Sequence, residues 1–195
     1  MSRLAFDSEH EGQTGVDDAW IERWRAGMRS DIAVLLDTFA SRFGFPPGDH
    51  GVSGPATAAE LDGLARLHGG AVPGDLLSFH RVVAEVELPD VNNGYWIHRP
   101  PLPGADPGHP RRLSDGRAVV VFGSDGGGAL FALAGGSGSP VLRLADGSFL
   151  GGAYEADCAT EIAANLQNFL TFLHRELTGF VASSIGKRHG VRSPQ

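Results

Sequence analysis

Residues 119–134, VVVFGSDGGGALFALA, constrain the fold more than any other stretch of the chain. A phosphate-binding loop would need a lysine and a hydroxyl residue after the last glycine, at the start of a helix. Gly128 is followed instead by Ala-Leu-Phe-Ala-Leu, and three consecutive glycines do not match the spacing of a dinucleotide-binding loop. The stretch therefore predicts a β-hairpin, in which glycine permits positive φ and Asp125 bonds to the local backbone.

Short β-prone runs continue on either side of this hairpin. They read RAVVVFG, ALFAL, PVLRL and SFLGGAYE, and the segments between them are rich in glycine, serine and aspartate. This pattern predicts an antiparallel meander of about four to six strands. Residues 89–116 hold six of the twelve prolines and predict a long loop, in which only GYWIH is a candidate strand.

Apolar residues spaced three and four apart predict helices at both ends of the chain. The first begins at Asp17 or Asp18 and ends at Gly44, with Gly27 as a candidate kink. Its Trp20 and Trp24 suit either a ligand platform or the core, and helical spacing favours the core. Two short helices follow, one opened by a Thr57–Glu60 capping box and one opened by Pro73.

The last helix is expected over TEIAANLQNFLTFLHRELTG, with Ile162 in its apolar stripe and Gly179 as its C-terminal cap. Because helices and strands come in blocks, the chain is expected to have an α+β fold, with helices packed on an antiparallel sheet. A flexible arm over 1–16, one domain over 17–180 and a disordered tail over 181–195 complete the expected organisation.

The net charge of −7 argues against a nucleic-acid-binding protein, which needs clustered Lys and Arg. An acidic surface suits a basic protein partner, although solubility alone explains the same charge. No apolar run is long enough to span a membrane, and the N-terminal residues do not resemble a signal peptide. Cys158 is the only cysteine, which fits a reducing compartment, and we expect a cytoplasmic protein.

The motifs of common enzymes and metal sites are missing. Eight histidines occur without an HExxH or a paired CxxC motif, and no GxSxG elbow is present. We therefore expect no catalytic residue, no cofactor and no metal. A competing hypothesis places His80, His98, His109 and Asp125 in a pocket under the proline-rich loop, as part of an enzyme or a small-ligand-binding protein.

Three segments resemble parts of the SUKH superfamily, which includes bacterial immunity proteins of polymorphic toxin systems and yeast cell-wall-assembly regulators. They are TAAELDGLARLHGGAVPGDLLSFHRVV, VVVFGSDGGGALFAL with the following SPVLRL, and NLQNFLTFLHREL. The resemblance covers about residues 55–178. Val72 departs from the leucine common before the proline, and the 99–116 loop and the long first helix look like additions.

The resemblance implies a non-enzymatic domain that binds another protein. In bacterial members the partner is often a toxin, so the chain is expected to be an immunity protein. A basic nuclease-type toxin is a candidate partner, because the acidic charge of this chain would complement it. The alternative is a regulatory or scaffold module without a toxin. Candidate contact residues are Asp90, Tyr95, Trp96 and Asp125, because aromatic side chains beside carboxylates are typical of interfaces. Tyr95 and Trp96 suit the core of the sheet equally well.

Overall fold

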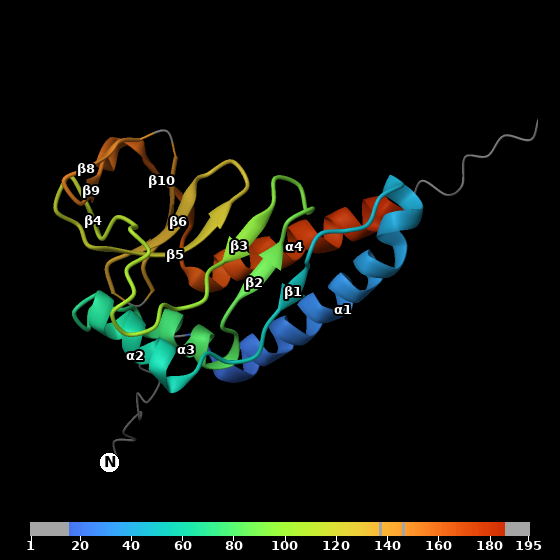
Figure 1. Ribbon diagram of the computed structural model, residues 1–195, viewed down its shortest axis with the longest axis horizontal. Helices are drawn as coiled ribbons and strands as arrows, with labels where there is room; N and C mark the ends of the chain where they lie inside the picture. The colour runs from blue at the N-terminus through green and yellow to red at the C-terminus, as the bar shows by residue number, and fades with distance from the viewer. Residues whose placement is uncertain (1–15, 137, 146, 186–195) are drawn as a thin grey trace, which may run out of the picture.

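The computed structural model describes residues 16–136, 138–145 and 147–185. A seven-stranded sheet lies between a layer of helices and a small three-stranded sheet (Figure 1). The α+β class with an antiparallel sheet and helices at both ends is therefore confirmed. In the large sheet the strands follow the order β1 (Gly51–Val52), β2 (Val86–Leu88), β3 (Tyr95–Ile97), β5 (Val119–Asp125), β6 (Leu130–Ala134), β7 (Val141–Leu144) and β10 (Ala159–Ala163).

Every pair of neighbouring strands in the large sheet is antiparallel. The glycine-rich stretch is the expected hairpin: β5 and β6 pair, and Gly128 has a φ of +87° in the turn between them. The hairpin interpretation of this stretch is confirmed.

Two expected assignments near the end of the sheet are wrong. SFLGGAYE does not continue the meander; it forms β8 (Phe149–Leu150) and β9 (Ala153–Tyr154) in the small sheet. There β9 pairs in parallel with β4 (Arg112–Leu113), which comes about 40 residues earlier in the chain. The next strand of the meander is β10, which was expected to be the beginning of the last helix.

Helices α1 (Asp18–Phe43) and α4 (Leu166–Ile185) pack on one face of the large sheet and against each other (Figure 1). The ends of α1 are as expected, because the Asp17 carboxylate accepts from the Ala19 N–H and Gly44 adopts a φ of 80°. Trp24 is buried and donates its indole N–H to the Leu170 carbonyl at 2.8 Å, and Trp20 packs against the same core. The core interpretation of this pair is confirmed.

The expected bounds of the last helix are wrong at both ends. Asn165 precedes α4 and its side chain accepts from the Asn168 N–H, so the helix starts after the strand that contains Ile162. Gly179 does not end it, since the helix continues to Ile185. Helical residues thus extend into the tail expected over 181–195, of which 186–195 lie outside the described residues.

At the other end, Val16 is buried in the core, so the arm expected over 1–16 overlaps the domain by one residue. The remaining positions of that arm, 1–15, lie outside the described residues. The short helices α2 (Ala58–Leu67) and α3 (Gly74–Val82) cross one end of the sheet, and the 3-10 turn η1 (Ala156–Cys158) precedes β10.

The described residues cover the second face of the large sheet over only part of its width. A separate apolar cluster joins the outer side of β5, β6 and β7 to the small sheet through Leu113 and Tyr154. None of the described helices and strands lies over the part of this face that β1, β2 and β3 form (Figure 1). This part is called the uncovered face. Among the described residues, no helix is long and apolar enough to cross a membrane.

Candidate binding site on the uncovered sheet face

One row of side chains crosses the uncovered part of the sheet. The register pairs Gly51 with Glu87, Glu87 with Trp96, and Trp96 with Ser124, so these four positions lie side by side on adjacent strands. Successive residues of a strand point to opposite faces. The neighbours Val86, Leu88 and Ile97 are buried on the helix side, and Glu87 and Trp96 therefore point to the uncovered side.

Two tight turns support the indole of Trp96. A Cβ atom added at Gly94 would lie 2.7 Å from the Trp96 ring, and one added at Gly126 would lie 3.6 Å from it. The two turns are joined by a hydrogen bond from the Gly126 N–H to the Asn93 carbonyl. The two glycines thus leave room for the indole to lie against their backbone, and Trp96 as a whole is half-buried.

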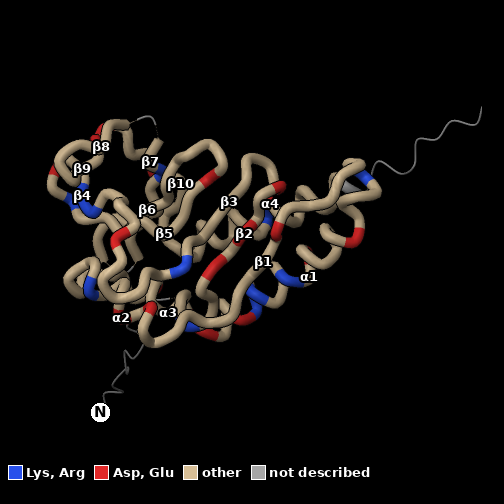
Figure 2. The backbone as a smooth tube through the Cα atoms, in the orientation of Figure 1, with Lys and Arg blue, Asp and Glu red and all other residues tan. Residues whose placement is uncertain are grey.

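The charge of this face is acidic. Glu87 makes no ion pair within the part of the chain that the structure describes, and Glu85 has a third of its side chain exposed. Figure 2 shows acidic segments along β2, with few basic ones beside them. Arg99, a cation that follows β3, contacts both Glu60 at 3.1 Å and Glu85 at 3.3 Å.

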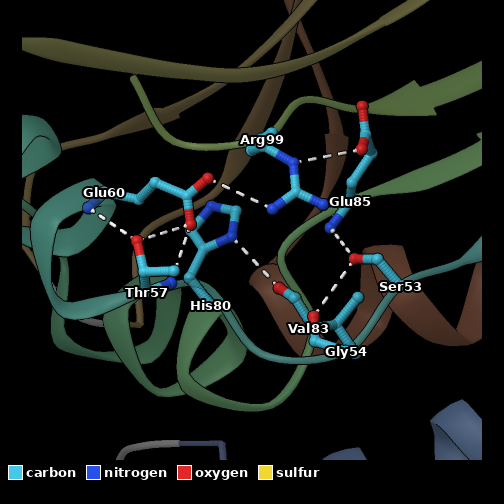
Figure 3. A network of polar contacts seen from close by, with 8 residues as sticks. All are labelled: Ser53, Gly54, Thr57, Glu60, His80, Val83, Glu85 and Arg99. Carbon is cyan, nitrogen blue, oxygen red and sulfur yellow. Dashed lines mark hydrogen bonds and ion pairs between the residues drawn. The ribbon is translucent and has the colours of Figure 1, made fainter. Parts of the chain in front are cut away.

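A polar network joins the start of β2 and the end of β3 to helix α2 through Glu85, Arg99 and Glu60 (Figure 3). The expected capping box is present: the Thr57 hydroxyl accepts from the Glu60 N–H, and the Glu60 carboxylate accepts from the Thr57 N–H at 2.7 Å. The second carboxylate oxygen of Glu60 accepts from Arg99. The Thr57 N–H, aided by Arg99 and opposed by burial, holds the pKa of Glu60 below its ordinary value.

Asp125, one of the expected contact residues, has a structural role. Its carboxylate is buried and accepts from the N–H groups of Gly127 and Ala129 at 2.9 and 3.0 Å. It also pairs with Arg143 at 2.9 Å. Burial raises the pKa of Asp125, but the hydrogen bonds from Arg143, Ala129 and Gly127, together with the charge of Arg143, outweigh it and leave that pKa below its ordinary value. Little of this carboxylate is available to a partner.

Replacing Asp125 by alanine should therefore destabilise the hairpin and leave Arg143 without its partner. We expect a loss of about 2–3 kcal/mol in the free energy of unfolding, since two backbone bonds and one partly buried ion pair disappear. Urea unfolding of the wild-type chain and of Asp125→Ala measures this loss. Asp115→Ala is the matched control, because that exposed carboxylate also bonds a turn N–H, at Arg117. An equal and small loss in the two variants would contradict the structural role of Asp125.

The other expected contact residues do not form one patch. Tyr95 faces the helix side, where its ring lies 6.5 Å from Phe131 and 6.0 Å from Phe172 between ring centroids. Burial, and then the carboxylate of Glu176, raise the pKa of Tyr95. Asp90 lies beside β1, where it accepts from the Gly48 N–H and contacts His50 at 2.9 Å. Only Trp96 of the four is on the uncovered face.

The competing hypothesis placed three histidines and Asp125 in one pocket, and the structure brings the three histidines together. His80, His98 and His109 line one cavity beneath the proline-rich loop, and Asp125 is not among its lining residues. His68 lines the same cavity and was not among the expected residues. In the described ranges, no group of three or more His, Cys, Asp or Glu side chains is placed so that it could hold a metal ion.

The geometry of the uncovered face suits recognition. It offers the aromatic ring of Trp96, a side chain enriched at binding hot spots, and beside it the carboxylate of Glu87, which is unpaired within the described residues and can complement a basic partner. No protein-family model matches this chain, and no curated protein matches it.

Proposed function

We propose that the protein is a non-enzymatic protein-binding domain, and that its partner docks on the uncovered face of β1, β2 and β3. The observation that carries this proposal is the row in which Glu87 lies directly beside Trp96, on a sheet face that none of the described helices and strands covers. An exposed sheet face with an aromatic anchor and complementary charges is a common basis for protein recognition.

The partner's chemistry follows from the charge. Glu87 is unpaired within the described residues and the whole chain carries a net charge of −7, so a basic partner would be steered to this face. The resemblance to the SUKH superfamily supports the more specific proposal of an immunity protein that neutralises a cognate toxin, such as a basic nuclease. A regulatory module without a toxin uses the same face and is the alternative. A cytoplasmic location stays a prediction.

Co-expression with the proteins encoded by neighbouring genes tests the proposal. We expect one neighbour to co-purify with this chain and its toxicity to be suppressed. The Glu87→Lys variant should weaken the complex about tenfold or more, because it reverses the charge next to the anchor. Asp37→Lys is the matched control, since it reverses an exposed charge on α1, on the opposite side of the sheet.

The two versions of the proposal give different results. Suppressed toxicity supports the immunity role, whereas a stable complex with a non-toxic neighbour supports the regulatory role. Equal weakening by Glu87→Lys and Asp37→Lys would contradict docking on the uncovered face. Failure to bind any neighbour would count against the proposed function as a whole.

A further inference from the structure

A cavity of about 330 Å³ lies between α2, α3, β5 and the proline-rich loop. This volume falls at the lower end of the range of roughly 300–1,000 Å³ that is typical of small-molecule sites. Its walls are mainly apolar. The aliphatic and aromatic side chains that line it are Leu64, Leu67, Leu76, Val121 and Phe122.

The loop that roofs the cavity is held directly on helix α2. A Cβ atom at Gly63 would lie 2.0 Å from the Pro101 carbonyl oxygen, so the two backbones touch at this point. Pro100, Pro101 and Pro107 contribute to the lining, and proline restricts the backbone of the loop. The cavity is therefore already formed in the free protein.

The described residues that line the cavity leave no unpaired charge in its interior at neutral pH. Burial lowers the pKa of His80 and that of His98 to about 4, and the charge of His109 adds to the effect at His98. At the rim, Arg99 is paired with Glu60 and Glu85. Arg111, also at the rim, is paired with Asp106. An ionised ligand would lose its hydration in this site without gaining a counter-charge.

The imidazole rings supply flat surfaces and one specific acceptor. The rings of His98 and His109 lie 5.4 Å apart between centroids, at an interplanar angle of 30°. His98 Nε2 is hydrogen-bonded to Ser124 Oγ at 2.8 Å. In His80, Nδ1 lies 3.2 Å from the Val83 carbonyl oxygen and must donate to it, so Nε2 carries the lone pair.

We propose that this cavity is a binding site for a small, planar, uncharged molecule with one N–H or O–H group, in the chemical class of phenols and indoles. The apolar walls and the imidazole faces take the ring, and a neutral imidazole nitrogen accepts the ligand's hydrogen bond. This inference does not depend on the partner proposal, because the cavity lies beneath the proline-rich loop and neither Trp96 nor Glu87 lines it.

The test titrates indole and phenol into the full chain at pH 7.5, with benzoate as the anionic counterpart. Binding is followed by ligand-observed NMR and by amide chemical shifts of the protein. We expect saturable binding of indole or phenol, with shifts centred on the lining residues of α2, α3 and β5. Benzoate should bind at least about tenfold more weakly, since both arginines that line the cavity are already paired with carboxylates.

Two tryptophan variants give a matched comparison. Leu67→Trp fills the cavity and should weaken indole binding by about tenfold or more, whereas Leu102→Trp, at an exposed position of the same loop, should leave it within about twofold. Absence of saturable binding of both probes to the wild-type chain, shifts centred elsewhere, or tighter binding of benzoate would each overturn the proposal. All three outcomes are read on the wild-type chain, so they stand even if Leu67→Trp fails to fold.

Discussion

Alanine at position 63 is expected to destabilise the fold by about 2 kcal/mol, although alanine is normally favoured over glycine within a helix. The added methyl group would lie 2.0 Å from the Pro101 carbonyl oxygen and 2.7 Å from the Leu102 carbonyl carbon. Both atoms belong to the backbone, so they yield only if the whole loop moves away from α2. The gain in helix propensity, about 1 kcal/mol, offsets only part of that cost.

Two other glycines in helices provide controls for this prediction. Gly179 lies within α4, where an added Cβ would meet no described atom within 4 Å apart from its chain neighbours and the adjoining backbone of its own helix, so Gly179→Ala should stabilise the protein by up to about 1 kcal/mol. Gly27 lies in α1, where an added Cβ would be 2.6 Å from the His174 ring, and Gly27→Ala should be intermediate because a side chain can shift. Urea unfolding of the three variants measures the order. A stabilised Gly63→Ala variant would contradict the contact between the loop and α2.

Acidification from pH 7 to pH 4 is expected to weaken the fold substantially, before most carboxylates are protonated. Burial lowers the pKa of His80 and of His98 from an ordinary value of 6.5 to about 4. Between these two pKa values the unfolded chain binds more protons than the folded one. The contribution that the two neutral histidines make to the free energy of unfolding is therefore fully present above pH 6.5 and is lost as the pH falls toward 4. The fully buried His80 accounts for about 3 kcal/mol, and the more exposed His98 for less.

Urea unfolding at several pH values, together with an NMR titration of the histidine rings, measures this effect. The rings of His80 and His98 should titrate near pH 4. In His98→Gln the amide can still bond Ser124 but does not titrate, so the fall in stability between pH 6.5 and pH 4 should be smaller. The carboxylates of Glu60 and Asp125 add to the loss of stability as the pH falls below their ordinary pKa values, because both have lowered pKa values in the folded chain. Titration of both histidines near pH 6.5 would contradict the burial of their rings.

Local signals in the sequence predicted the elements that local interactions determine. The ends of α1 were found because Asp17 and Gly44 have the side chain and the backbone freedom that helix ends need. The β5–β6 turn was found because its glycines and Asp125 satisfy the turn by themselves. The capping box of Thr57 and Glu60 belongs to the same group.

Elements that depend on distant partners were misassigned. Ile162 continues the helical spacing of Leu166 and Phe169, yet residues 159–163 form a strand because β7 offers them an open edge. β9 joins the small sheet through β4, a partner far away in the sequence. Local rules marked Gly27 as a candidate kink, whereas α1 runs on through it and the glycine makes room for His174.

The candidate site was predicted only in part for the same reason. Trp96 was selected for its aromatic character, but its neighbour Glu87 enters the site through strand register, which the sequence does not specify. The histidines of the cavity come from α3, from the residues that follow α2 and β3, and from the loop. The proline-rich composition of that loop was the available signal, and it indicated where they would meet.

The dissociation constant of the complex with the co-purifying neighbour, measured for the wild-type chain and for Trp96→Ala, tests the proposed binding face most directly. Thermal unfolding of both chains shows whether the variant stays folded. We expect Trp96→Ala to weaken the complex about thirtyfold or more, as loss of a central aromatic anchor does. An unchanged dissociation constant in the folded variant would contradict docking on the uncovered face of β1, β2 and β3.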